Sequence, residues 1–418
     1  MATENKEEAF PWHLGVYDAH CHPTDTMSSI ETIQDMKARV LTVMATRAED
    51  QDLVMSVADK HGIKSFDPAQ WSKEECIVPC FGWHPWFSYQ MYLTEEQDDD
   101  TKSPNQEPLT GEAKIKHYQS VLQPSRQPPS EQDRAVLLSL PDPTPFTAFL
   151  SLLRQNLKKY PYAMVGEIGL DRAFRVPEAW AAGNNADLWA KRNDSLTLGG
   201  REGRRLTPFR CTLAHQKRIF KMQLQLAAEM GRAVSVHGVQ AHGSVLEVLS
   251  ELWKGHEEEV LSKRERKKRG VDHLKAGVEL VEEGKDEETK QTTTTTPTPK
   301  PYPPRICLHS YSGSPSIFAQ YCNPAIPAQI FISFSTAINL SDTPTDSSTP
   351  QNFIDMINTV PDHMLLVESD LHTAGQEMDK RLADIVTRIC KIKEWSLEKG
   401  VEILGRNWRR FAFGGGGD

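Results

Sequence analysis

This chain has little of what marks membrane or secreted proteins. It contains no run of about 18 consecutive apolar residues, the length that a membrane-spanning helix requires. Its first ten residues are polar and acidic and lack the basic and apolar blocks of a secretory signal. The seven cysteines are odd in number and scattered, which argues against a disulfide framework and favours a reducing compartment. We therefore expect a cytoplasmic protein that could also enter the nucleus and that has no membrane partner.

Positive charge is also in the minority. Lys and Arg number 48 against 57 Asp and Glu, so the formal net charge is -9 at pH 7. This balance argues against a protein that holds nucleic acid through a broad basic surface. It does not exclude an enzyme that grips one phosphate group with metal ions.

The length of 418 residues suggests two or three domains, but the composition is uneven. Segments 95–140, 175–205 and 255–304 are rich in charge runs, Pro, Ser, Thr or Gly, and we expect all three to be insertions or mobile loops. Without them about 290 residues remain, near the size of one embellished barrel. The chain is therefore expected to form one barrel domain over 1–413, followed by a flexible Gly-rich tail at 414–418.

Short β-rich runs alternate with helical patterns in the remaining sequence, which is typical of a parallel α/β sheet. One such helix is expected at Leu213–Met230, where apolar residues recur at helical spacing before Gly231. Eight strands with intervening helices favour a closed (β/α)8 TIM-type barrel over an open sheet. The expected strands are Gly15–His20, Val40–Ala45, Ile77–Gly82, Ala163–Ile168, Ala233–His237, Ile306–His309, Ile330–Phe334 and Met364–Glu368.

Five of these eight strands end in His, Glu or Asp, whose side chains can bind metal ions or transfer protons. His20 and His22 close the first strand, and because side chains alternate along a strand, both project to the same side. A carboxylate such as Glu167 inside an apolar strand is costly to bury unless it is paired or metal-bound. The carboxyl ends of barrel strands are the face where catalytic groups sit, so the joint pattern predicts a metal site. The other residues at these ends are His237, His309, Glu368 and Asp370.

At this point the sequence resembles the TatD family of metal-dependent deoxyribonucleases, which belongs to the amidohydrolase-like barrel superfamily. The resemblance extends from about Gly15 to Phe413, interrupted by the insertions. The motifs that carry it are, in chain order, His20-Cys21-His22, Gly82-Trp83-His84-Pro85, Gly166-Glu167-Ile168-Gly169-Leu170-Asp171, Val236-His237, His309-Ser310-Tyr311-Ser312-Gly313, Glu368-Ser369-Asp370 and Asn407-Trp408-Arg409-Arg410-Phe411.

The resemblance implies a site for two divalent metal ions, with Mg²⁺, Mn²⁺ or Zn²⁺ as candidates. Glu167 and Asp370 would be the catalytic residues, Asp370 also accepting a proton from the attacking water. His84 would face the substrate. The implied ligands are His20, His22 and Asp370 for one ion, His237 and His309 for the other, and Glu167 as the bridge between them.

The sequence departs from the family pattern around the substrate. After the fifth-strand histidine the family commonly carries an Arg–Asp-like pair, whereas this chain reads Gly238-Val239-Gln240-Ala241-His242, with no Arg. After the last Asp the family usually has a Ser-Pro pair, whereas this chain has Leu371-His372. Arg172 stands where an aromatic residue is common. His242 and His372 could help to replace the missing Arg, but exposed loop histidines without such a role are commoner.

Three functions remain open at this point. The first is hydrolysis of phosphodiester bonds in DNA, exonucleolytic in form, by a water that two metal ions activate. The second is hydrolysis of another ester or amide bond. The third is a non-catalytic scaffold whose insertions dock protein partners. The basic run at 263–269 could serve nuclear import or contact nucleic acid, but such a run between Glu-rich stretches is more often a solvated charged segment.

Overall fold

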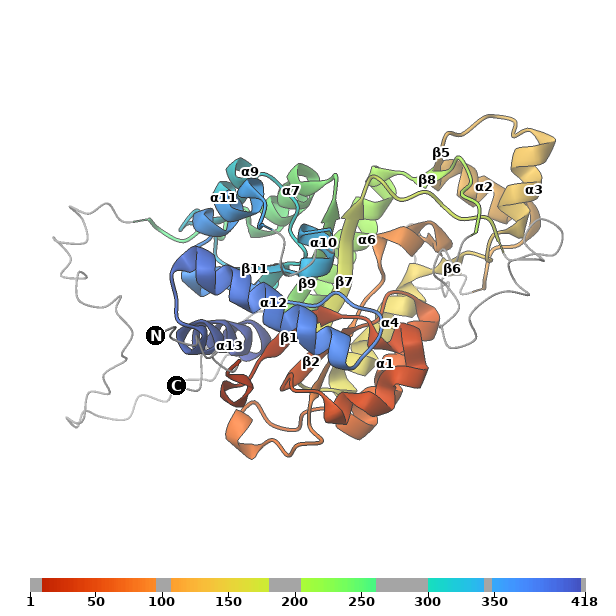
Figure 1. Ribbon diagram of the computed structural model, residues 1–418. Coiled ribbons are helices and arrows are strands. Elements are labelled where there is room, and N and C mark those ends of the chain that lie inside the picture. Colours follow the sequence, from red (N-terminus) through yellow and green to blue (C-terminus); the bar gives the residue numbers. More distant parts are fainter. Residues whose placement is uncertain (1–9, 95–106, 180–203, 261–299, 342–347, 415–418) are drawn as a thin grey trace, which may run out of the picture.

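The computed structural model describes residues 10–94, 107–179, 204–260, 300–341 and 348–414. Its central feature is an eight-stranded parallel sheet surrounded by helices, seen in Figure 1. The strand order is β1-β2-β3-β7-β9-β10-β11-β12, so each strand lies beside its neighbour in the sequence. This order is that of a (β/α)8 barrel rather than of a doubly wound sheet, in which the strand order reverses part-way.

Every strand expected from the sequence is present, with bounds that shift by at most three residues. Neighbouring strands pair in parallel, with a shift of register within β1–β2 and another within β7–β9. Ile306, for example, pairs with Val234 on one side and Ile330 on the other. The strands are β1 Tyr17–Cys21, β2 Val40–Met44, β3 Ile77–Phe81, β7 Met164–Asp171, β9 Val234–Val239, β10 Arg305–Leu308, β11 Gln329–Phe334 and β12 Leu365–Val367.

Backbone hydrogen bonds bring the first and last strands together. The amide of Asp370, just after β12, donates to the carbonyl of His20 at 3.0 Å, and the amide of His22 donates to the carbonyl of Leu371 at 2.9 Å. The sheet therefore curls round until its two edges meet at their carboxyl ends. This closure brings residues from opposite ends of the sequence to one rim.

Helices follow most strands and cover the outside of the sheet. Thr212 caps the start of helix α6, its hydroxyl accepting the amide of His215. The helix ends one residue before the expected limit, and Gly231 follows in the left-handed region at φ 64°. The helices are α1 Ala48–His61, α4 Phe146–Lys159, α6 Leu213–Glu229, α7 His242–Trp253, α9 Pro315–Tyr321, α10 Thr336–Asn339, α11 Gln351–Thr359, α12 Gln376–Lys393 and α13 Leu397–Phe413, with 3₁₀ helices η1 Trp12–Leu14, η2 Pro23–Asp35, η3 Pro68–Gln70, η4 Pro85–Gln90 and η6 Asp362–Met364.

Helix α13 packs against the amino-terminal end of the barrel. Trp408 is 1% exposed and stacks on Tyr17 of β1, with ring centroids 4.6 Å apart, while its indole N–H donates to Thr42 of β2 at 3.2 Å. The amide group of Asn407 donates to the carbonyls of Asp362 and Leu365 at 2.7 and 2.9 Å. The carboxyl-terminal helix is thus part of the barrel core, and the opposite end of the barrel is left for chemistry.

The described part of the first insertion differs from the loop that its composition predicts. Residues 107–140 contain α2 Gly111–Val121 and α3 Glu131–Ser139, which project from the barrel at the upper right of Figure 1. Tyr118, Leu137 and Phe209 belong to a small core of their own, which also includes Tyr89 of η4. The few apolar residues of this Pro- and Gln-rich stretch are enough to fold it into helices, although its average composition predicts a loop. Two short sheets complete the structure: β4 Met91–Tyr92 with β6 Thr144–Pro145, and β5 Leu122–Gln123 with β8 Arg210–Cys211.

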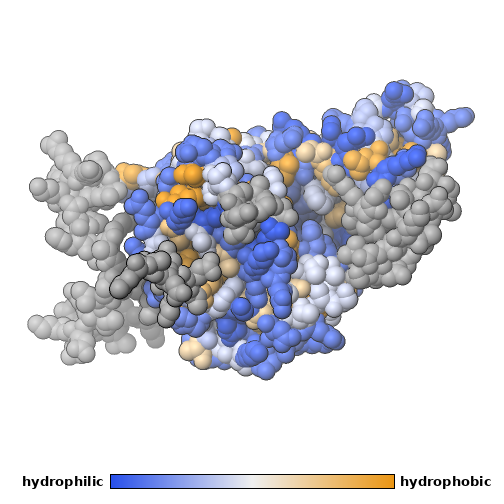
Figure 2. Space-filling view, in the orientation of Figure 1, coloured by the Kyte–Doolittle hydropathy of each residue, from blue (hydrophilic) through white to orange (hydrophobic). Residues whose placement is uncertain are grey.

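The other expected insertions lie mostly outside the described residues, as do the basic run at 263–269 and the tail from 415 onward. Within the described ranges, no helix has both the length and the apolar composition that crossing a membrane requires. The face drawn in Figure 2 is mostly hydrophilic, with small and separate hydrophobic patches, one of them over the α2–α3 region.

Candidate metal centre

Glu167 lies at the centre of a cluster of histidines at the carboxyl end of the barrel. It belongs to β7 and is 3% exposed. Its Oε1 atom contacts one nitrogen each of His237, His309 and His84 at 2.7, 2.8 and 3.0 Å. Its Oε2 atom lies 3.3 Å from His22 and 3.4 Å from His20. One buried carboxylate therefore faces five imidazoles that come from four strands or the loops that follow them.

The His-x-His pair at the end of β1 points both rings to the same place, as alternation along the strand predicts. The Nε2 atoms of His20 and His22 are 3.1 Å apart. Asp370 completes this side, with Oδ1 3.5 Å from His22 Nε2 and 3.9 Å from His20 Nε2. Asp370 follows β12 in the left-handed conformation, at φ 53°, which turns its carboxylate back over the barrel.

Outer partners orient three of the histidine rings. Nδ1 of His20 lies 2.9 Å from the Ser235 hydroxyl, and Nε2 of His237 lies 3.3 Å from Oδ2 of Asp171. Nδ1 of His309 faces Oε1 of Glu368 at 3.6 Å, an ion-pair distance that is too long for a hydrogen bond. In each ring the other nitrogen points to Glu167. Such outer contacts fix the tautomer, so the inward nitrogens are left with lone pairs for a cation.

His84 has a different arrangement. Its Nδ1 accepts the backbone N–H of Trp86 at 3.1 Å, so in the neutral ring the proton is on Nε2, which donates to Glu167 at 3.0 Å. Burial lowers the pKa of His84 to about 4, against the opposing charge of Glu167, so the ring is neutral at pH 7. His84 is 2% exposed and is placed to orient Glu167. Its expected contact with substrate stays a prediction.

Asp171 is held by four donors. Oδ1 accepts the backbone N–H groups of Ala173 and Phe174 at 2.6 and 2.8 Å, and Oδ2 accepts the indole N–H of Trp86 at 2.6 Å as well as contacting His237. Burial alone would raise its pKa, but these hydrogen bonds outweigh burial and lower the pKa to about 2. The ionised carboxylate is the natural acceptor for an N–H on His237.

Two further acids are buried behind the cluster. Asp18 accepts the amides of His20 and Ser369, both at 3.0 Å, and so ties β1 to the segment after β12. Burial raises the pKa of Asp18 to about 7 despite these hydrogen bonds. Glu368 accepts the amide of Ser310 at 2.8 Å and the hydroxyl of Ser333 at 2.5 Å. These contacts hold the strand ends that carry His20, His309 and Asp370.

The donor set fits divalent metal ions. Nitrogens as close as 3.1 Å in His20–His22 and 3.2 Å in His237–His309 repel unless a cation or a proton lies between them. Burial alone would lower the pKa of His22, but its contacts with Asp370 and Glu167 outweigh burial and raise it well above the usual value. Metal ions and protons would therefore compete for one site. Two overlapping groups could each hold an ion: His20 with His22 and Glu167, and His20 with His309 and Asp370. A third group, His84 with Glu167 and His237, is equally compact, but His84 could ligate an ion only after losing the Nε2 proton that it donates to Glu167.

The structure brings together all seven residues that the sequence singles out as ligands, catalytic groups or substrate contacts. The division of ligands between two ions stays a prediction. His242 and His372 lie near the site: His242 faces the Ser312 hydroxyl at 3.2 Å, and His372 lies beside His22 and contacts Asp25 at 2.7 Å. The orienting roles of Asp171, Ser235 and Trp86 were not expected. The role of Asp171 could have been predicted, because it is an acid at the end of an apolar strand motif. Nothing in the sequence around Ser235 indicates its role.

Comparison with known proteins agrees with this geometry. Residues 17–412 match the family model described as TatD related DNase. The chain belongs to the TatD family. The family is metal-dependent, which agrees with the buried His, Glu and Asp cluster. The barrel architecture and the ordered motifs are thus those of a TatD-family hydrolase.

Two curated relatives extend over most of this TatD-family chain. The Cut9-interacting protein scn1 of Schizosaccharomyces pombe is 34% identical over 396 residues, which cover 95% of this chain and 98% of the relative. The uncharacterized deoxyribonuclease YMR262W of Saccharomyces cerevisiae is 24% identical, over 84% of this chain and 82% of the relative. Among solved structures, the TatD homologue YJJV of Escherichia coli aligns with a TM-score of 0.44 and 16% identity, covering 94% of this chain and 95% of that one.

Proposed function

We propose that this protein is a metal-dependent hydrolase of phosphodiester bonds in DNA. The observation that carries the proposal is the convergence of five imidazoles and the Asp370 carboxylate on Glu167, at the barrel end where catalytic groups sit. The name of the Saccharomyces relative as a deoxyribonuclease supports DNA as the substrate. A more specific part of the proposal is that cleavage starts from an end of the DNA strand, as in an exonuclease.

The proposed ligands are those inferred from the family resemblance: His20, His22 and Asp370 for one ion, His237 and His309 for the other, and Glu167 between them. Bound divalent ions would supply a water of lowered pKa and positive charge for the phosphoryl oxygens. Asp370 would accept the proton of the attacking water. Burial alone would raise its pKa, but the hydrogen bond from His22 and the nearby imidazoles lower it, so the carboxylate is ionised and able to accept.

The outer residues would act by positioning. His84 donates to Glu167 and limits its rotation, while Asp171 holds the ring of His237. Arg172 is exposed directly after Asp171 and offers a cation to a phosphate near this rim. These features support a site with fixed ligands on the inside and adaptable substrate contacts on the outside. Hydrolysis of another ester or amide bond remains the alternative activity.

The decisive experiment measures cleavage of oligonucleotides that carry a label at the 3′ or the 5′ end. The purified chain is stripped of metal and then supplied with Mg²⁺, Mn²⁺ or Zn²⁺. We expect metal-dependent cleavage that Glu167→Gln and Asp370→Asn abolish. Glu251→Gln is a matched control, because Glu251 lies on the surface of α7 in an ion pair with Lys221. Near-normal cleavage by Glu167→Gln would refute the proposed centre.

A second proposal is that the protein also binds a protein partner. The supporting observation is the Schizosaccharomyces relative, which is named for its interaction with Cut9. The projecting α2–α3 segment would be the candidate surface, and a cytoplasmic and nuclear location would be compatible with both proposals. Metal content separates a purely scaffolding role from catalysis. Less than about one ion per chain after saturation would favour the scaffold.

A further inference from the structure

A cavity lies at the end of the barrel opposite the metal centre. It encloses about 400 Å³, within the range of small-molecule sites. Ala163 and Ala233, which directly precede β7 and β9, and Arg305, the first residue of β10, contribute to its lining. Because these positions are the amino ends of strands, the cavity is separated from the histidine cluster by the length of the barrel.

Two arginines give this cavity its chemistry. Arg232 donates one Nη2 hydrogen bond to the carbonyl of Leu157 at 2.8 Å, and its buried Nε has no partner among the described residues. Arg305 donates from Nε to the carbonyl of Phe411 at 2.8 Å and from Nη2 to that of Ala412 at 3.4 Å. Each guanidinium has five N–H donors, so both retain donors for a ligand.

No carboxylate balances these two charges within the described part of the chain. Among the described residues, no ion pair joins Arg232 or Arg305 to a carboxylate, and none of the described residues that line the cavity is Asp or Glu. Burial lowers the pKa of Arg305 to about 10, and the charge of Arg232 adds to this effect. Two partly buried like charges with unused donors are a favourable setting for an anion, which would relieve both the repulsion and the unpaired donor.

Aromatic side chains form another part of the lining. Phe66 is 57% exposed, unusually so for a large apolar residue. Phe413 packs edge-on against Tyr162, with ring centroids 6.0 Å apart, so both rings are held in place. Exposed and fixed aromatic faces in one cavity favour a ligand that has a flat ring of its own.

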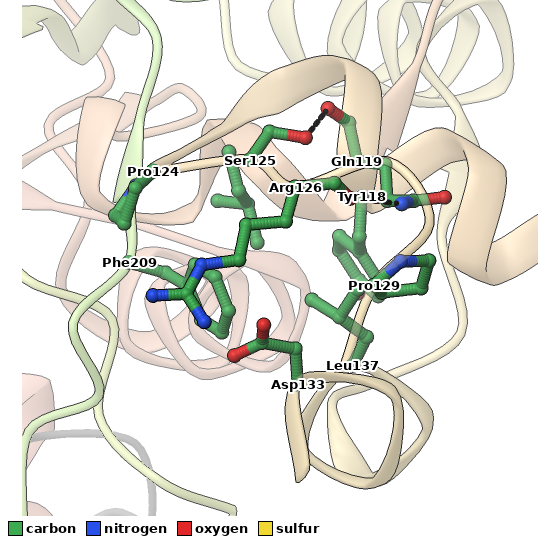
Figure 3. A pocket seen from close by; sticks show the side chains of 10 residues that line it. Tyr118, Gln119, Pro124, Ser125, Arg126, Pro129, Asp133, Leu137 and Phe209 are labelled. Carbon is green, nitrogen blue, oxygen red and sulfur yellow. Dashed lines mark hydrogen bonds between the residues drawn. The ribbon is translucent and has the colours of Figure 1, made fainter. Parts of the chain in front are cut away.

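A much smaller pocket provides a contrast. It lies between α2, α3 and Phe209, with Arg126 and Asp133 among the labelled side chains of Figure 3. Its volume is about 10 Å³, room for about one water molecule, and it includes an acid as well as a base. That pocket is a packing gap, whereas the cavity at the barrel's amino end has both the size and the unbalanced charge of a binding site.

We propose that the cavity at the amino end of the barrel binds a small organic phosphate that carries an aromatic ring, of which a nucleoside monophosphate is the simplest example. The guanidinium groups of Arg232 and Arg305 would bind the phosphate, and Phe66 with Phe413 would contact the ring. This proposal does not rest on the proposed nuclease activity, because none of its residues belongs to the metal centre.

The test is calorimetric titration of the full chain with deoxyadenosine monophosphate in the presence of EDTA. The chelator removes metal, so binding through ions at the histidine cluster does not contribute. We expect one site per chain, weakened roughly tenfold or more by Arg232→Gln. Arg154→Gln is the matched control, because Arg154 lies on the outside of α4 and pairs with Glu229. Glu167→Gln should bind the nucleotide as the wild type does.

Separate ligands resolve the two halves of the proposed site. Inorganic phosphate and deoxyadenosine should each bind more weakly than the nucleotide, and Phe66→Ala should weaken the nucleotide more than the phosphate. Phe66 is exposed, so this variant keeps the test valid if Arg232→Gln fails to fold. Absence of nucleotide binding, equal affinity for phosphate alone, or full affinity in folded Arg232→Gln would each overturn the proposal.

Discussion

Replacing Asp171 by Asn should weaken metal binding without altering any ligand. The Asn carbonyl oxygen can still accept the backbone N–H groups of Ala173 and Phe174, which bind Oδ1 at 2.6 and 2.8 Å. The Asn amide then faces the indole N–H of Trp86 and Nε2 of His237, both of which Oδ2 accepts in the native chain. The Asn amide and the indole N–H of Trp86, both donors, would then face each other, and Nε2 of His237 would lose the oxygen that accepts its proton.

The consequence for His237 is a change of tautomer. With an N–H group opposite Nε2, that nitrogen is favoured as an acceptor, and the ring proton moves to Nδ1, the atom that lies 2.7 Å from Glu167. A protonated Nδ1 has no lone pair for a metal ion. Loss of an outer-shell partner typically costs about 10- to 100-fold in metal affinity, or about 1.4 to 2.8 kcal/mol. The unmatched indole donor should cost a further 1–3 kcal/mol or so of folding stability.

The measurement is competition for Mn²⁺ or Zn²⁺ against a chromophoric chelator, combined with urea unfolding of the metal-free chain. Asp379→Asn is the matched control, because Asp379 also accepts two backbone amides, those of Lys37 and Ala38, at 2.8 and 2.9 Å but lies away from the cluster. It should lose stability and keep its metal affinity. Asp171→Asn with metal affinity within about twofold of the wild type would refute the tautomer argument.

Two further substitutions test how the fold supports the site. Gly169→Ala would place a Cβ against the carbonyl of His237, so it should both destabilise the protein and lower its metal affinity. Gly243→Ala is the control and should do neither, because a Cβ at that position meets no atom within 4 Å. Equal unfolding curves and metal affinities for the two variants would contradict this expectation. Trp408→Ala removes a buried ring that stacks on Tyr17 and should cost about 3–5 kcal/mol in urea unfolding, and a loss below about 1 kcal/mol would show that α13 is not part of the core.

The barrel and the inner ligands could be predicted because both leave regular traces in the sequence. Strands buried on both faces appear as short apolar runs, and a His or Glu at the end of such a run is conspicuous. Parallel strands bring their carboxyl ends to one rim, so His20 and Asp370 meet although 350 positions separate them. Hydrogen bonds between β1 and the residues after β12 close the barrel and so bring these two residues to the same rim.

The outer residues could not be predicted because their roles depend on distances that sequence patterns do not encode. Ser235 is an ordinary strand residue until its hydroxyl lies 2.9 Å from His20, and the tautomer of His84 depends on one backbone amide. The α2–α3 segment was missed for a different reason. Its few apolar residues pack against Tyr89 and Phe209, which lie outside the segment, so its own composition underestimates the core that it can form.

The proposed site at the amino end of the barrel is harder to find from sequence for the same reason. Strand starts are set by solvent-side turns, where an Arg is unremarkable, so Arg232 and Arg305 carry no signal until the structure places them around one cavity. Once the structure places them there, the two arginines indicate a ligand, because each donates to a helix carbonyl and still has N–H groups to spare. An arginine that only capped a helix would need no cavity beside it. The combination of spare donors, a described lining without carboxylates and about 400 Å³ of space therefore argues for a ligand rather than for structure alone.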